Sequence, residues 1–533
     1  MAAFNVLSYS IENLVQCFLD GSPHTSKDEV LAKRHYIYFQ EYFQALGAAT
    51  IVVERNYTDR DYLEDYAAYY DRCFQDYPRR TQRLHFFKVA FALAQFEATL
   101  VDPNAGVGEQ ALRAAYLGFV VVKPLPQTVV GRTCLTTYPT DDGRRQFPSL
   151  RTYPVNLFGL QLEVHSLAFQ EQDTVVAACA TSALWSCFQG TGKLFQHVIP
   201  PPVEITNWAG DHMPENLLTA SARAFPNAGL TGTQMAHAVR RVGLEPFVVG
   251  ANSRYSLNGV MYAYLRGKIP SILACKLISG LGTPEFSVMG GHAIALTGFS
   301  LGDSLASGFG PTGFMLRSTR IDKIYGHDDQ VGPFARMVWD KVQINSPAST
   351  DQPQLAPQQV EFLKTSWQGS VHANAEFVLL PLYHKIRVPF SVIHDAMLSL
   401  DAVLEISRSS LPTQARAEWD IYLTTANDYK TSVRADYSGF EFDIKPSLLV
   451  DLPRFVWRVT VRTEEQLQLD FLFDATGIAQ HDLLVHVVST GGAYAQMLGA
   501  IAPYVEQIPA MQAKAVLKRF LVSQIVPSSA VAA

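Results

Sequence analysis

Long hydrophobic runs are missing from this sequence. No stretch reaches the ~18 to 20 consecutive apolar residues that a membrane helix needs, and the closest, 483–505, is interrupted by the polar and glycine residues 489–492. Residues 1–20 also lack a basic segment followed by an apolar core, so we expect no signal peptide. The sequence therefore predicts a protein without a membrane partner.

Cysteine and positive charge are also scarce. The chain has 6 cysteines in 533 residues and no CxxC pair, so we expect no disulfide framework and infer a reducing, cytoplasmic location. Only 17% of the residues are charged, and the net charge is −6. A nucleic-acid-binding protein normally needs a basic surface that displaces counterions from phosphates. We therefore expect no nucleic-acid partner.

Apolar residues are plentiful, at 48% of the chain. This length and composition predict about two to four domains with substantial cores. Proline and polar residues cluster at 138–153 and at 346–359, as is typical of linkers. We therefore expect three domains, at residues 1–150, 155–345 and 355–533.

The first of these domains is predicted to be mostly helical. Tyrosines recur at helical spacing within 62–73, and we interpret them as residues that pack against neighbouring helices. Residues 83–100 form a second helix candidate. The apolar run 116–122 ends at a Lys-Pro pair and predicts a buried strand.

The last domain is predicted to be mixed α+β. Residues 454–462 and 466–473 alternate between apolar and polar side chains, which predicts a β-hairpin. Residues 511–525 are typical of a terminal helix. We find no arrangement of catalytic or metal-ligating residues in this domain.

The central domain contains the residues that indicate chemistry. From Cys179 the sequence predicts a helix that Gly190 can stop, with Cys187 on its core face. The unpaired N–H groups and the positive end of the dipole at a helix start stabilise a thiolate, and can also bind an oxyanion. Gln172 lies just upstream and could supply a second oxyanion donor.

Helices are followed by strands in this domain, which predicts an α+β fold. A capping box of Thr231 and Gln234 begins a helix that stops at Gly243. Another helix is predicted at 214–225. Strands are then expected at the following places: 244–249, 269–275, 290–299 with His292 at its start, 313–317, and a last one that ends near 329.

This order resembles the papain-like cysteine peptidases, and among them the C39-like enzymes related to bacteriocin-leader processing. The phrases that carry the resemblance are Gln172 before Cys179, Gly229-Leu230-Thr231, Gly243-Leu244, Lys268-Ile269-Pro270, and His292 through Gly298-Phe299. The resemblance implies a papain-like domain of helices followed by an antiparallel sheet, over about a third of the chain.

The resemblance also implies roles for particular residues. Cys179 would be the nucleophile and His292 the base, with Asp328 orienting the imidazole and Gln172 completing the oxyanion hole. Three further aspartates could replace Asp328 in that role: Asp303, Asp322 and Asp329. No cofactor and no metal are expected.

The predicted function is that of a cysteine hydrolase. A peptidase or isopeptidase would cleave an amide bond of a protein or peptide substrate through an acyl-enzyme. Two alternatives remain open. The same triad could carry out transfer or deamidation, or the papain-like domain could be a catalytically silent binding module.

Overall fold

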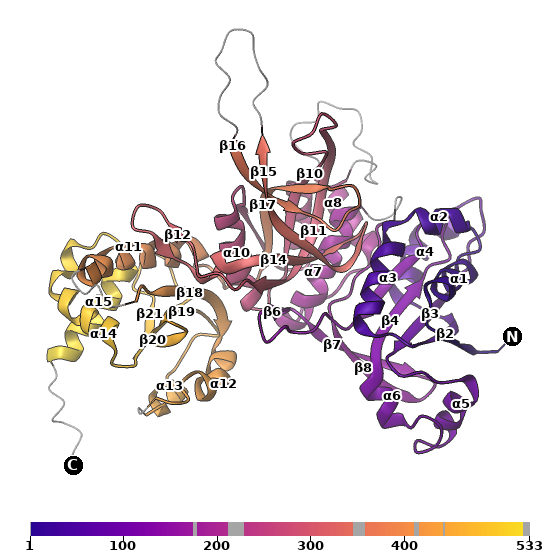
Figure 1. The fold of residues 1–533 in the computed structure, drawn as a ribbon, viewed down its shortest axis with the longest axis horizontal. Helices are drawn as coiled ribbons and strands as arrows, with labels where there is room; N and C mark the ends of the chain where they lie inside the picture. Colours follow the sequence, from indigo (N-terminus) through magenta and orange to yellow (C-terminus); the bar gives the residue numbers. More distant parts are fainter. Residues whose placement is uncertain are drawn as a thin grey trace, which may run out of the picture. The chain divides into compact units, whose positions relative to one another are not determined.

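The computed structural model describes residues 2–173, 178–211, 229–344, 358–409, 415–440 and 443–525 (Figure 1). The chain divides into two compact units. The first comprises 1–253, 269–300 and 323–381, and the second comprises 254–268, 301–322 and 382–533. These units cut across the three predicted domains, because the N-terminal segment and most of the central segment share the first unit.

The first unit begins with a five-stranded antiparallel sheet. Its strands follow one another in chain order: β1 (Phe4–Ser8), β2 (Thr50–Tyr57), β3 (Thr81–Phe87), β4 (Tyr116–Val122) and β5 (Val130–Leu135). The helices of this segment are α1 (Ile11–Gly21), α2 (Lys27–Ala32), α3 (Arg34–Leu46), α4 (Arg60–Ala68), α5 (Leu93–Val101) and α6 (Glu109–Ala115). The prediction of a mostly helical N-terminal domain therefore missed four of these five strands.

The error is clearest at residues 83–100, which were expected to be one helix. They begin inside strand β3 and end in α5. Every residue from 83 to 87 is buried, so a central strand covered on both faces explains this apolar run better than helical periodicity. By contrast, β4 has the predicted bounds, and Tyr62, Tyr66 and Tyr70 pack in one buried cluster as predicted.

A second antiparallel sheet follows in the same unit. Its order is β10-β11-β14-β15-β16-β17-β9, with β6 (Arg145–Gln146) beside β11. The strands are β9 (Glu245–Gly250), β10 (Ser271–Ser279), β11 (Ser287–Leu301), β14 (Ile321–Asp328), β15 (Gly332–Ile344), β16 (Gln358–Lys364) and β17 (His372–Leu382). Because β17 also pairs with β10, six of these strands close into a ring.

One hydrophobic core joins the two sheets of the first unit. It contains Phe39 and Phe43 of α3, Leu84 of β3, and Phe334 of β15. Helix α3 comes so close to β15 that a Cβ on Gly332 would lie 2.3 Å from the ring of Tyr38. This shared core explains why residues 1–150 do not form a compact unit of their own.

Helices precede the strands of the second sheet. They are α7 (Cys179–Phe195), α8 (Pro202–Gly210) and α9 (Gly232–Arg241). Helix α9 has the predicted Thr231–Gln234 capping box. The predicted helix at 214–225 lies outside the described residues. The hairpin of β7 (Arg151–Leu157) and β8 (Leu160–Ser166) comes before these helices.

Gly190 does not stop α7, contrary to prediction, because the helix continues to Phe195. A Cβ on Gly190 would lie 2.9 Å from Cγ of Pro270, so this glycine permits close packing of the helix. The residue that ends the helix is Gln196, whose φ of 60° leaves the right-handed helical region.

The second unit has a four-stranded antiparallel sheet. Its order is β18 (Glu418–Thr425), β19 (Phe455–Thr463), β20 (Gln466–Asp474) and β21 (Leu484–Ser489). The predicted hairpin is confirmed as β19 and β20, joined at Glu464 and Glu465, which both have positive φ. The predicted terminal helix is confirmed as α15 (Met511–Ile525).

Further helices of the second unit are α10 (Arg254–Arg266), α11 (Phe390–Ser409), α12 (Ala426–Asp436), α13 (Lys445–Leu449) and α14 (Ala493–Ile501). The segment 301–322 contributes the short pair β12 (Gly308–Phe309) and β13 (Phe314–Met315), where a single strand over 313–317 was expected. The fold class is mixed α+β with several antiparallel sheets, as predicted. Among the described residues, no helix has both the length and the apolar character needed to cross a bilayer.

Candidate active site

Cys179 is the first residue of helix α7. Ala178 before it has extended backbone and no side chain that caps the helix, so the first N–H groups of α7 receive no side-chain cap from that position. Cys179 and Cys73 are partly exposed, whereas the other four cysteines are buried. Cys187, two turns further along α7, is fully buried, as predicted for a core residue.

His292 lies inside strand β11 rather than at its first residue as predicted, and it faces Cys275 of β10 in the register of the two strands. Its side chain is only 6% exposed. Residues 290 and 291 before it are glycines, and a Cβ at either position meets no described atom within 4 Å. Cys179 lies close enough to His292 to act on its imidazole and to favour its charged form. The structure thus brings together the two residues that the sequence proposes as base and nucleophile.

Asp328 is the last residue of β14, as the sequence predicts for the third group. Its Oδ1 lies 3.0 Å from Nε2 of His292 and also accepts the backbone N–H of Gln330 at 3.1 Å. Because Nε2 is held by the carboxylate, the ring nitrogen left for the sulfur of Cys179 is Nδ1. The three side chains are therefore arranged in the order thiol, imidazole, carboxylate, with a hydrogen bond between the last two.

Trp367 completes the surroundings of this chain, and our sequence interpretation missed it. Its indole N–H donates to Oδ2 of Asp328 at 2.7 Å, and its ring meets the ring of His292 edge-on at 5.6 Å. The guanidinium of Arg34 covers the indole at 3.6 Å from the ring centroid. Trp367 follows strand β16 without any motif, so no sequence signal identifies it.

The electrostatics of the group favour a charged imidazole. Burial opposes the positive charge on His292, but the carboxylate of Asp328 and the hydrogen bonds to Asp328 and Cys179 raise the pKa of the imidazole well above its usual value. Burial likewise opposes ionisation of Asp328, yet the charge of His292 and the N–H donors lower the pKa of Asp328. The pair is therefore a buried imidazolium–carboxylate ion pair.

Asp329 is the nearest alternative to Asp328. Its Oδ1 is 3.7 Å from Nε2 of His292 and makes no hydrogen bond with any described residue, while Oδ2 accepts from the side chain of Gln330. Burial, together with the negative charge of Asp328, raises the pKa of Asp329 to about 6. The distances favour Asp328 as the group that orients His292. Asp303 and Asp322 belong to the second unit.

Gln172 is half-buried and precedes residues 174–177, which lie outside the described residues. Its neighbours are tied down: Glu171 pairs with Lys33 and accepts the backbone N–H of Val130 at 3.1 Å, and Asp173 accepts from the hydroxyl of Tyr70. The segment that carries Gln172 is therefore anchored to the first sheet. The role of Gln172 in an oxyanion hole stays a prediction.

The same residues offer a set of metal ligands. Ligand atoms of His292, Asp328 and Asp329 all lie within 4.8 Å of one another. A cation bound there would compete with the imidazole for Oδ1 of Asp328 and with the indole of Trp367 for Oδ2. Because both carboxylate oxygens already accept from N–H donors, the arrangement favours proton transfer over metal ligation.

No protein-family model matches the chain, and a search of curated proteins finds no match. The argument for function therefore depends on the geometry of the site.

Proposed function

We propose that this chain is a papain-like cysteine hydrolase, a peptidase or isopeptidase that cleaves an amide bond of a protein or peptide. The observation that carries the proposal is the arrangement of Cys179 at a helix start, next to His292, which is hydrogen-bonded to Asp328. A nucleophile, a base within hydrogen-bond reach and a group that orients the base are the parts that acyl transfer requires. Helices followed by an antiparallel sheet support the papain-like comparison.

In the first half of the proposed reaction, the proton of the thiol has moved to His292. The thiolate sulfur of Cys179 attacks the carbonyl carbon, and the π electrons of the carbonyl move to its oxygen. N–H groups at the start of α7 can stabilise this oxyanion, with Gln172 as the second proposed donor. The C–N bond then breaks as the imidazolium donates its proton to the leaving nitrogen, and a thioester remains.

In the second half, the neutral imidazole of His292 takes a proton from water. The resulting hydroxide oxygen bonds to the thioester carbon, and the sulfur leaves as a thiolate that takes up its ion pair with the reprotonated imidazole. Asp328 keeps Nε2 occupied throughout and stabilises the charged ring. Trp367 holds the second oxygen of Asp328 and limits the access of water to the pair.

Transfer and deamidation use the same groups and differ only in the nucleophile that resolves the thioester or in the amide attacked. The proposal takes hydrolysis as the simpler case, because it needs no acceptor other than water. All six cysteines are free, which fits the reducing, cytoplasmic setting that we infer.

The proposal is tested by the rate at which iodoacetamide labels individual cysteines at neutral pH, read by peptide mass mapping. Cys73 is an internal reference, because it is the other partly exposed thiol. We expect Cys179 to be labelled much faster than Cys73, and the excess to disappear in His292→Ala. Equally slow labelling of Cys179 and Cys73 would leave a binding module as the better reading.

A second measurement separates the chemistries. A peptide mixture is incubated with the wild-type protein and with Cys179→Ala, and the products are read by mass. Cleavage adds the mass of water across two fragments, whereas deamidation raises the mass of one peptide by about one unit without cleavage, since O–H replaces N–H₂. Identical profiles for the two proteins would contradict both.

A further inference from the structure

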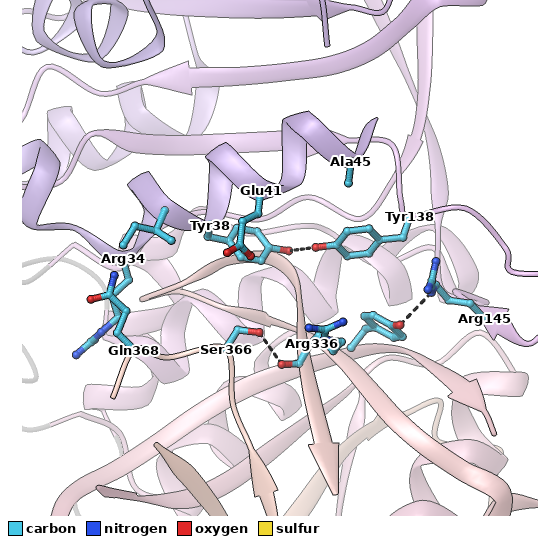
Figure 2. Close-up of a pocket in the computed structure, with 11 residues that line it drawn as sticks. Arg34, Tyr38, Glu41, Ala45, Tyr138, Arg145, Arg336, Ser366 and Gln368 are labelled. Carbon is cyan, nitrogen blue, oxygen red and sulfur yellow. Dashed lines mark hydrogen bonds between the residues drawn. The ribbon is translucent and has the colours of Figure 1, made fainter. Parts of the chain in front are cut away.

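A pocket of about 340 Å³ lies in the first unit, between helix α3 and the second sheet. Figure 2 shows Tyr38 and Glu41 on the helix facing the strands that carry Arg336, with Tyr138 and Arg145 at one end and Arg34 at the other. The mechanism proposed above uses none of the residues that line it. Its volume lies in the range of small-molecule binding sites.

Positive charge dominates this pocket. Arg34, Arg145 and Arg336 line it, against the single carboxylate of Glu41. Within the described part of the chain, none of these arginines has a carboxylate oxygen within 4.0 Å, unlike the buried Arg83, which pairs with Glu54 at 2.7 Å. Three guanidinium groups that make no ion pair within 4.0 Å with a described carboxylate are unexpected in a protein of net charge −6. They form a site for an anion.

The arginines approach from separate elements, and contacts fix the guanidinium groups of Arg34 and Arg145. Arg145 donates from Nε to the hydroxyl of Tyr325 at 2.9 Å and from Nη1 to the carbonyl of Pro139 at 2.6 Å. Arg34 lies on the indole of Trp367. Arg336 is exposed, and its backbone carbonyl accepts from the hydroxyl of Ser366 at 2.7 Å. Arginines fixed in this way lose little side-chain entropy when they bind an oxyanion.

Aromatic rings form much of the remaining wall. Tyr38, Tyr138 and Tyr325 line the pocket, and the hydroxyls of Tyr38 and Tyr138 lie 3.1 Å apart. An inorganic anion would fill only a small part of the volume, so the rings have room for an attached flat or apolar group. Such a group can stack on the tyrosine faces.

We propose that this pocket binds a small molecule that carries an oxyanion, a phosphate or carboxylate, on an aromatic or similarly flat body. Arg145 and Arg336 bind the oxyanion, and the three tyrosines contact the body.

The pocket also shares a wall with the proposed active site. Arg34 lines the pocket, covers Trp367 and acts electrostatically on Asp328. An anion bound by Arg145 and Arg336 adds negative charge to the pocket that Arg34 shares with the ion pair of His292 and Asp328, and this charge, acting across the pocket, stabilises the imidazolium. The ligand would therefore modulate the active site, an effect that rests on the proposed function, whereas the binding itself does not.

Binding is tested by calorimetric titration of the full chain with phenyl phosphate, benzoate and inorganic phosphate, up to about 10 mM. We expect phenyl phosphate or benzoate to bind saturably and more tightly than inorganic phosphate. The ratio of the affinities for phenyl phosphate and benzoate shows whether the pocket prefers a phosphate or a carboxylate. Arg145→Gln and Arg336→Gln should each weaken binding about tenfold or more, because each removes a charge-assisted contact.

The matched control is Arg72→Gln, which removes the same charge from an exposed position outside the pocket. The affinity of this variant for each of the three anions should equal that of the wild type. Absence of saturable binding by all three anions would overturn the proposal, and so would equal weakening in Arg72→Gln and Arg336→Gln. Tighter binding of inorganic phosphate than of phenyl phosphate would contradict the role given to the tyrosines.

The link to the active site is tested by the pH dependence of iodoacetamide labelling at Cys179. The ligand should shift the basic limb of the profile to higher pH by a few tenths of a unit in the wild type, but not in Arg34→Gln. Binding with an unchanged profile would overturn the link and leave the pocket as a site. If Cys179 is labelled slowly even in the ligand-free wild type, the result would instead contradict the proposed function.

Discussion

Each unit of the molecule buries a charged side chain against a carboxylate. The two clusters differ in whether a nitrogen of the cation remains available to a group that can react. In the second unit, Arg458 binds Asp470 at 2.7 Å, Asp436 at 2.6 Å and the hydroxyl of Ser432 at 3.0 Å. In the first unit, His292 binds Asp328 at 3.0 Å and offers its other nitrogen to Cys179.

Comparing the Arg458 and His292 clusters shows what separates a structural ion pair from a reactive one. A guanidinium keeps its proton at any ordinary pH, and all three nitrogens of Arg458 have partners, so this cluster can only hold the sheet to α12. An imidazole gains and loses its proton, and its second nitrogen meets a thiol at a helix start. Burial and a carboxylate are common to both, so neither feature alone indicates catalysis.

The largest effect in this comparison is expected from Arg458→Met. The change leaves Asp470 and Asp436 without their cation and should cost about 3–5 kcal/mol of local stability. Hydrogen exchange of the amides of β19 and β20, read by mass spectrometry, measures it. Arg462→Met on the same strand, where the side chain is more exposed, is the control. Cys179 labelling should not change in either variant, and a change would contradict the separation of the two roles.

The next effect is that of His292→Ala on reactivity. Removing the base should slow the labelling of Cys179 at neutral pH about 100-fold, which corresponds to about 2.7 kcal/mol. The exposed His165 provides the control variant His165→Ala, in which the rate should stay that of the wild type. A rate in His292→Ala within twofold of wild type would show that the thiol reacts without the imidazole.

The ion pair also predicts how stability depends on pH. The pKa of His292 is raised by folding, so its contribution is complete below its unfolded value of about 6.5 and is lost as the pH rises through the folded value. The pKa of Asp328 is lowered, so its contribution is present above about 3.9 and is lost as the pH falls through the folded value. The stability difference between the wild type and His292→Gln should therefore be greatest between about pH 4 and 6.5. Thermal unfolding of both proteins across pH measures it, and a difference that grows above pH 8 would contradict the assignment.

A smaller effect is expected from Trp367→Phe. The variant keeps the ring against His292 but removes the N–H that donates to Asp328, a hydrogen bond to a charged group that is worth about 1.5–3 kcal/mol. The pKa of Asp328 should rise, and the acid limb of the labelling profile should move to higher pH by about one unit. Trp339→Phe, on β15 of the same unit, is the control. If the acid limb does not move, Trp367 contributes by packing against His292 and not through its hydrogen bond to Asp328.

The smallest effect is expected from Asp329→Asn. Its carboxylate lies farther from His292 than that of Asp328, so labelling of Cys179 should stay within twofold of the wild type. Asp328→Asn should slow labelling more than tenfold, since the imidazolium loses its counter-ion. If Asp329→Asn has the larger effect, Asp329 and not Asp328 is the group that orients His292.

Local signals in the sequence predicted many elements well. The capping box of α9, the hairpin of β19 and β20, and the bounds of β4 and α15 all depend on residues within a few positions of one another. Errors occurred where a distant contact decided the outcome. Gly190 stays inside α7 because Pro270 packs on it, and residues 81–87 form a strand because β2 and β4 pair with it on either side.

Two buried histidines also show that local sequence signals do not predict the effect of distant contacts. His327 precedes Asp328 in the chain, yet its Nε2 contacts the carbonyl of Leu167 at 2.9 Å and its Nδ1 accepts the N–H of Phe334 at 3.1 Å. Burial lowers the pKa of His327 to about 3, so it stays neutral. His292, equally buried, is charged. The carbonyl of Leu167 and the carboxylate of Asp328 come from distant segments of the chain, so the sequence cannot show which histidine is neutral.

Spacing and capping act over a few residues, so they predict the helix start at Cys179, the strand around His292 and the strand that ends at Asp328. Only the tertiary structure decided that these three meet, that Trp367 closes over them, and that Arg34 ties them to a cationic pocket. The reason is register: Asp328 and Trp367 come 36 and 39 residues after their partners in the chain. Contacts over such separations depend on how strands pair, which no local pattern encodes.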